Sequence, residues 1–151
     1  MSKYVHRAHN VSVLLYHYVC AVKYRKGIFD DKVEEVLLRT CEEISQRYDI
    51  NFLEIGTDKD HVHFLIQSVP TLAPERIARV VKSITAKEIY RLCPWIEQKL
   101  WGGNVWSAGY FVSTVSRTGC EGQVKNYVRS QKKEYHQLMR GQLVLFDEHK
   151  H

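Results

Sequence analysis

Several features that mark special classes of protein are missing from this sequence of 151 residues. No apolar stretch is long enough to cross a membrane as a helix, and the first residues lack the hydrophobic region of a signal peptide. Cysteine is scarce: the four residues are widely spaced and form no Cys-x-x-Cys pair, which argues against a zinc knuckle and favours reduced thiols in a cytoplasm. Internal repeats and low-complexity segments are also missing, so a single domain spanning residues 1–151 is the simplest organisation.

The charge balance points weakly towards a polyanionic partner. Lysine and arginine number 22 against 17 acidic residues, which gives a formal net charge of +5 when the histidines are neutral. A modest positive charge is compatible with many functions, and among them it favours nucleic-acid binding. The hydrophobic fraction of 44% is ordinary for a globular domain that builds its own core.

Cations and an aromatic ring interleave at the end of the first expected strand, in Lys23, Tyr24 and Arg25. Such residues suit phosphate contacts and the stacking of an unpaired base, so we take them as candidate nucleic-acid-binding residues. A solvated turn would carry the same residues, and this alternative stays open. The irregular stretch 93–109 contains three tryptophans, which form either a small satellite core or further stacking surfaces.

The most informative stretch runs from Asp58 to Gln67, in which we expect a tight turn over residues 57–60 to lead directly into a strand that begins at His61. Because successive side chains on a strand point to opposite faces, one face is purely apolar and the other carries two adjacent imidazoles, those of His61 and His63. Each imidazole nitrogen needs a partner, so this pair suits the binding of one metal ion better than plain burial. A half-exposed polar face is the alternative. Asp60 is interpreted as a turn residue rather than as a partner of an imidazole.

The order of expected elements is β-α-β-β-α-β followed by one more helix. This is the ferredoxin-like or RRM-like α+β arrangement, an antiparallel sheet with its helices on one face, which leaves the other face free for a ligand. A flexible basic arm (1–9) precedes it and a tail (141–151) follows. The expected elements are a strand at 10–23, a helix from Asp30 or Asp31 to about 48, strands at 50–56 and from 61, a helix at 74–92, a strand at 110–116 and a helix at about 121–139. In the first helix, six residues recur at helical spacing and are expected to face the sheet: Val33, Val36, Leu37, Thr40, Cys41 and Ile44.

A second group of candidate site residues lies on the last expected helix. Tyr127 and Gln131 are four residues apart, so their side chains project from the same side of the helix. The glutamine offers a carbonyl oxygen that suits a hard cation, and the tyrosine offers a hydroxyl nucleophile. His61, His63 and Gln131 make a neutral three-ligand set, which leaves the double charge of Mg²⁺ or Mn²⁺ to polarise a phosphate. Taken alone, such a Tyr–Gln pair on a helix usually lies on the protein surface and has no catalytic role.

Together, the histidine pair on a strand and the Tyr–Gln pair on a late helix resemble the single-tyrosine HUH transposases. These are the small TnpA-type enzymes of insertion sequences that move as single-stranded DNA. The resemblance runs from Val11 to Gln131 and covers nearly the whole chain. Its typical segments are Lys23-Tyr24-Arg25, Thr57-Asp58-Lys59-Asp60-His61-Val62-His63 and Phe111-Val112-Ser113-Thr114-Val115.

The resemblance implies a reaction and a role for each site residue. His61, His63 and Gln131 would bind one divalent cation, Mg²⁺ or Mn²⁺. The hydroxyl of Tyr127 would attack a DNA phosphodiester, form a 5′-phosphotyrosine and release a 3′-OH. The bond energy is then kept for rejoining the strand without a nucleotide cofactor.

The resemblance also implies partners and a location. The substrate would be single-stranded DNA with a hairpin near each end of the element. The enzyme would be a homodimer in which the tyrosine helix of one subunit can serve the histidine pair of the other. Gly119 and Gly122 fit this arrangement, because glycines allow the helix to swing on its connection. We expect a cytoplasmic, nucleoid-associated prokaryotic protein without a membrane partner.

Three other functions remain compatible with parts of the pattern. An RRM-like binder of single strands would share the topology, the charge and the aromatic residues, but it gives no reason for two histidines and a Tyr–Gln pair to converge. A domesticated relative that processes chromosomal palindromic repeats would share all catalytic residues. A metal-dependent hydrolase of small molecules would turn over without forming a protein–DNA adduct.

Overall fold

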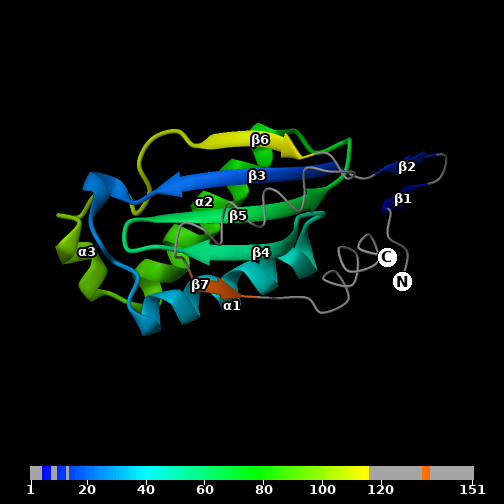
Figure 1. The fold of residues 1–151 in the computed structure, drawn as a ribbon. Helices are drawn as coiled ribbons and strands as arrows, with labels where there is room; N and C mark the ends of the chain where they lie inside the picture. Colours follow the sequence, from blue (N-terminus) through cyan, green and yellow to red (C-terminus); the bar gives the residue numbers. More distant parts are fainter. Residues whose placement is uncertain (1–4, 8–9, 13, 116–133, 137–151) are drawn as a thin grey trace.

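A computed structural model describes residues 5–7, 10–12, 14–115 and 134–136, and it describes side chains for 14–115. An antiparallel five-stranded sheet has the order β6-β3-β5-β4-β7, and two long helices cover one of its faces (Figure 1). The first four strands of that order have the ferredoxin-like arrangement. The fold class predicted from the sequence is therefore confirmed. The bounds are β3 Leu14–Ala21, α1 Asp31–Arg47, β4 Asn51–Thr57, β5 His61–Ser68, α2 Pro74–Leu92, β6 Phe111–Val115 and β7 Glu134–His136.

The two long helices begin where the sequence predicts, and α1 buries the predicted stripe. The carboxylate of Asp30 accepts a hydrogen bond of 2.9 Å from the amide of Val33, which caps α1. Pro74 is the first residue of α2, where its missing N–H costs nothing. The buried residues of α1 are the six that the helical spacing indicated: Val33, Val36, Leu37, Thr40, Cys41 and Ile44.

The two faces of the sheet are packed differently. The helix-covered face contributes Val62, Phe64 and Ile66 to the large hydrophobic cluster. We expected the other face to be free for a ligand, and the structure shows that only part of it is. A second, small cluster occupies part of it, because leucine and valine side chains from four strands are buried there together: Leu15, Leu53, Leu65 and Val115.

Short elements complete the described structure. The strand expected at 10–23 is divided: β2 (Asn10–Ser12) pairs with β1 (Val5–Arg7), which lies within the predicted arm, and β3 follows separately. A 3-10 turn, η1 (Lys23–Arg25), ends β3, and α3 (Trp95–Lys99) lies in the irregular aromatic stretch. Among the described residues, no helix has the length and apolar character that crossing a membrane requires.

The helix predicted at 121–139 is wrong at its carboxyl end. Residues Glu134–His136 form β7, which pairs with the outer edge of β4 in the register Thr57↔Glu134 and Ile55↔His136. The physical reason is that an edge strand presents unpaired N–H and C=O groups, and an added strand satisfies them. The rest of the predicted helix, including Tyr127 and Gln131, lies outside the described residues.

Candidate functional site

Three histidines gather on the sheet face opposite the helices. His61 and His63 lie on the same side of β5, and their ring centroids are 5.2 Å apart. On the neighbouring strand β3, His17 is placed diagonally to His63, which itself pairs with Val19. The three imidazoles line one hollow of about 490 Å³, and Arg25 from η1 and Phe111 from β6 line it as well.

His61 is held by a chain of polar contacts that begins in η1. The Nε of Arg25 donates to Oδ2 of Asp60 over 3.0 Å, and Oδ1 of Asp60 lies 2.7 Å from Nδ1 of His61. Burial raises the pKa of Asp60, but the hydrogen bonds from His61 and Arg25 outweigh it, so the pKa lies below its usual value. The carboxylate therefore stays ionised and accepts the Nδ1–H proton, which leaves the Nε2 lone pair of His61 available to a ligand.

The interpretation of Asp60 as a turn residue alone is therefore wrong. Asp60 does precede β5 directly, but its carboxylate also orients the imidazole of the next residue. A carboxylate on the second nitrogen of a metal-binding histidine fixes the tautomer and the ring orientation. The two interpretations of Asp60 do not exclude each other, because one residue can both end a turn and bind the imidazole that follows it.

His63 has its own partner, which the sequence analysis missed. The Nε2 of His17 lies 3.0 Å from Nδ1 of His63, and the two rings stack with a centroid distance of 5.2 Å and an interplanar angle of 15°. Burial lowers the pKa of His17, so its ring is neutral near pH 7 and its Nε2 can accept a hydrogen bond. When His63 donates its Nδ1–H to that atom, its Nε2 carries the lone pair, which is the form of the ring that binds metals.

The two histidines fit a metal site that is completed by a further ligand. Both histidines use Nδ1 for a neighbour in the protein and can present Nε2 to a shared ligand, which is the usual arrangement around a bound divalent cation. Within the described residues, no group of three or more His, Cys, Asp or Glu side chains is arranged to hold a metal. A complete site needs at least one further ligand, and the predicted one, Gln131, lies outside the described residues.

The candidate residues Lys23, Tyr24 and Arg25 are brought together in η1, but their side chains serve three different places. Arg25 lines the histidine hollow, and Tyr24 meets the ring of Trp101. Lys23 lines a second hollow, and its Nζ also lies 5.6 Å from the ring centroid of Tyr24. The sequence indicated one basic and aromatic edge. The structure divides it because Tyr24 and Arg25 adopt positive φ values of 60° and 53°, which turn the chain sharply.

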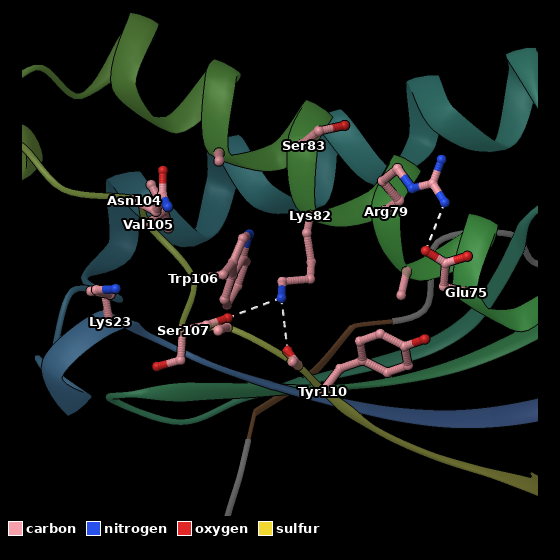
Figure 2. Close-up of a pocket in the computed structure, with 14 residues that line it drawn as sticks. Lys23, Glu75, Arg79, Lys82, Ser83, Asn104, Val105, Trp106, Ser107 and Tyr110 are labelled. Carbon is pink, nitrogen blue, oxygen red and sulfur yellow. Dashed lines mark hydrogen bonds and ion pairs between the residues drawn. The ribbon is translucent and has the colours of Figure 1, made fainter.

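The second hollow, of about 420 Å³, lies between α2 and the segment 104–110 (Figure 2). Two of its cations are engaged within the protein. Arg79 pairs with Glu75 at 2.6 Å, and Nζ of Lys82 donates to the carbonyl oxygens of Ser107 and Gly109 at 2.9 and 2.7 Å. Lys82 thus fastens the segment that leads into β6, which is a structural role.

Comparison with known proteins assigns the chain to a family. The family model "Transposase IS200 like" matches residues 10–131. The ISDra2 transposase TnpA of Deinococcus radiodurans is 30% identical over 118 residues, which are 78% of this chain and 84% of that protein. The transposase for insertion sequence element IS200 of Salmonella typhimurium is 23% identical over 119 residues, 79% of this chain and 77% of that protein. The chain therefore belongs to the IS200-like transposases, the single-tyrosine HUH family that its sequence resembles.

Solved structures share the fold. The crystal structure of a transposase from D. radiodurans R1 superimposes with a TM-score of 0.69 at 27% identity, over 84% of this chain and 97% of that one. A REP-associated tyrosine transposase bound to a REP hairpin gives a TM-score of 0.54, over 85% of this chain and 68% of that one. At 10% identity, the second comparison shows the fold alone. Family and fold together make this chain a transposase, an enzyme that processes DNA.

Proposed function

We propose that this transposase cleaves and rejoins single-stranded DNA at the ends of an insertion sequence through a covalent tyrosine intermediate. The observation that carries the proposal is the orientation of His61 and His63. Each ring is held at Nδ1 by a neighbour, and both rings line one hollow on the face away from the helices. Two imidazoles that are oriented through Nδ1 and line the same hollow suit the binding of one divalent cation, because imidazole is a common metal ligand.

His61, His63 and Gln131 would hold one divalent cation, Mg²⁺ or Mn²⁺. When bound, the cation would neutralise charge that develops on the phosphoryl oxygens of the DNA. The residues of the chain supply the orientation: Asp60 fixes the ring of His61, and His17 fixes the ring of His63. Neutral ligands suit this task, because they leave the charge of the cation to act on the substrate.

Tyr127 would be the nucleophile. Its hydroxyl oxygen gives up its proton and forms a bond to the scissile phosphorus, the bond from phosphorus to the 3′ oxygen breaks, and that oxygen takes up a proton as a free 3′-OH. The phosphotyrosine at the 5′ end is again a phosphodiester, so one ester replaces another and no nucleotide cofactor is consumed. Attack by a 3′-OH on this linkage reverses the reaction and joins two DNA ends.

The proposed substrate and assembly follow the family resemblance. The substrate is single-stranded DNA with hairpins near the ends, and a neighbour of the same fold is seen with a REP hairpin bound. We further propose a homodimer in which the helix with Tyr127 can complete the histidine site of the other subunit. The glycines upstream of Tyr127, at positions 119 and 122, would permit the exchange.

The test is a denaturing gel with labelled single-stranded oligonucleotides that span the ends of the element. The intact chain with Mg²⁺ or Mn²⁺ is expected to give a covalent protein–DNA band, and Tyr127→Phe is expected to give none while it still binds the oligonucleotide. An adduct mapped by mass spectrometry to another tyrosine would refute the assignment. Binding without any adduct would favour the RRM-like binder, and an adduct formed only on chromosomal palindromic repeats would favour the domesticated relative.

Mixing two inactive variants tests the shared site. Tyr127→Phe and His63→Ala subunits, mixed to form hybrid dimers, recover activity only if one chain supplies the tyrosine and the other supplies the histidines. A site built within one chain predicts no recovery, because each chain then lacks one essential group. Size-exclusion chromatography of the mixture confirms that dimers are present.

A further inference from the structure

Two aromatic rings lie exposed and in contact at the end of the sheet near the histidine hollow. Tyr24 in η1 is 53% exposed, and Trp101, two residues after α3, is 69% exposed. Their ring centroids are 5.0 Å apart and the planes meet at 63°, edge to face. Rings that stay this exposed remove little apolar surface from water, so burial does not explain why the fold brings them together.

The backbone under these rings is held in an unfavourable conformation. Among the described residues, the non-glycine residues with positive φ are Tyr24 at 60°, Arg25 at 53° and Trp101 at 53°. Side chains other than glycine adopt this region rarely, and residues held in it cluster at functional sites. Here two separate segments, η1 and the residue before Gly102, both use it, and both present an aromatic ring to the same place.

Cations surround the rings. The Nζ of Lys26 lies 4.6 Å from the ring centroid of Trp101, and the Nζ of Lys23 lies 5.6 Å from that of Tyr24. A third cation, Lys99, donates to the carbonyl oxygen of Gly27 at 2.7 Å and so ties α3 to the chain after η1. Positive charge around exposed aromatic faces is the combination that binds single-stranded nucleic acid, because phosphates meet the cations while bases stack on the rings.

The aromatic pair is joined to the histidine site through one residue. Arg25 follows Tyr24 directly, lines the histidine hollow and binds Asp60, which in turn binds His61. A strand that left the histidine pair over Arg25 would pass the residue that is joined directly to Tyr24. The second hollow is the weaker candidate, since Arg79 and Lys82 there already have partners within the protein.

We propose that Tyr24 and Trp101, with Lys23 and Lys26, form a stacking site for one unpaired base of the single-stranded DNA, adjacent to the phosphate that is cut. The inference rests on the proposed function, because it takes the histidine hollow as the place of cleavage. It divides the tryptophans of the irregular stretch into two roles. Trp106 is 4% exposed and donates to Thr85 within the core, whereas Trp101 is available to the substrate.

The test uses full-length Tyr127→Phe protein, which binds DNA without reacting, and single-stranded oligonucleotides that carry 2-aminopurine at successive positions. One position near the cleavage point is expected to lose fluorescence on binding, because stacking on an aromatic ring quenches that base. Trp101→Ala is expected to abolish the quenching and to weaken binding roughly 5- to 150-fold, the contribution of one stacked base. Trp101→Phe, which keeps a ring, should retain part of both signals.

The chain offers a matched control in Trp95, which is 47% exposed on the nearby α3. Trp95→Ala removes the same side chain type and is expected to leave quenching and affinity unchanged. Lys26→Gln should reduce the slope of the logarithm of the binding constant against the logarithm of the salt concentration by about 1, because one phosphate contact is lost. Thermal melting of each variant checks the fold, and Tyr24→Leu repeats the test if Trp101→Ala is unstable.

The outcomes separate this inference from the function on which it rests. If the intact chain forms the covalent adduct but Trp101→Ala and Tyr24→Leu bind and quench as the parent does, the stacking site is refuted and the proposed function stands. If no oligonucleotide gives an adduct but binding still depends on Trp101, the proposed cleavage is refuted and a nucleic-acid site remains. Equal losses in Trp95→Ala and Trp101→Ala would also overturn the specific site.

Discussion

The two faces of β5 place opposite demands on neighbouring residues. On the helix-covered face, Val62, Phe64 and Ile66 belong to the large hydrophobic cluster and are almost completely buried. On the other face, His63 is only 5% exposed, yet it is a polar ring that needs a partner for each nitrogen. His61, beside it, is tied to Asp60.

The difference shows how one strand separates stability from chemistry. The helix-facing side chains need apolar character and the right volume, which many hydrophobic residues provide. The imidazoles need specific partners at specific atoms, because an unsatisfied buried polar group costs free energy. Val62, Phe64 and Ile66 therefore contribute mainly to stability, and His61 and His63 would contribute mainly to the proposed reaction. Mutations on the two faces should have separable effects.

The largest expected effect is on the reaction, in His63→Ala. Removing this proposed ligand should lower strand cleavage by at least about 10²- to 10³-fold, the usual cost of losing a group that stabilises transition-state charge. The protein should remain folded, because the ring lies outside the large core. Adduct yield on a denaturing gel and a thermal melt measure the two properties. Retained metal-dependent cleavage would exclude His63 as a ligand.

The converse effect is expected one residue later, in Phe64→Ala. Phe64 is fully buried and packs edge to face on Phe52, with ring centroids 5.5 Å apart. Its truncation should reduce the free energy of unfolding by about 3–5 kcal/mol, through lost burial and a cavity. Urea unfolding measures this, and Phe64→Leu should lose less. Cleavage per folded molecule should stay near that of the parent; a specific loss of activity would break the separation of the faces.

A smaller effect is expected in Asp60→Asn, which keeps the shape but removes the charge that orients His61. Loss of such a supporting group typically costs about 10- to 100-fold in metal affinity or activity. Calorimetric titration with Mn²⁺ measures the affinity directly. Asp31→Asn is the control: this exposed carboxylate lies in the first turn of α1, does not line the histidine hollow and should matter less. Equal losses in both variants would indicate a general charge effect.

The smallest effect is expected in the pH dependence that His17 gives to stability. Burial holds its folded-state pKa below the ordinary 6.5, so the unfolded chain binds this proton more readily. The stability contribution is then fully present above about pH 6.5 and is lost as the pH falls through the folded pKa. Urea unfolding over this range should give a flatter pH profile for His17→Gln than for the parent. Parallel profiles would show that other groups cause the decline.

Local patterns in the sequence were sufficient for most of the fold. Helical spacing identified all six buried residues of α1, and alternation identified which side of β5 enters the large core. These predictions succeed because each depends on residues within a few positions of one another. Along β3, however, the single histidine in an apolar run was the signal for His17, and its meaning depended on pairing with a strand about fifty residues away.

Contacts between distant segments account for what the sequence left open. Trp101 and Trp106 stand in the same stretch, and only the packing of Trp106 on α2 distinguishes them. The strand β7 could not be read from its own residues, because its partner is the free edge of β4. Tyr127 and Gln131 stay predictions, since they lie outside the described residues.

The fastening of residues 107–109 has a consequence for the shape of the histidine hollow. The amide of Ser107 donates to the carbonyl oxygen of Ala21 on β3, and Lys82 of α2 binds the carbonyl oxygens of Ser107 and Gly109. The strand β6 begins two residues after Gly109, at Phe111. The ring of Phe111 meets that of His17 at a centroid distance of 6.2 Å. The point at which β6 starts is therefore fixed by anchors in both layers, and this places Phe111 and Ser113 of β6 in the wall of the hollow.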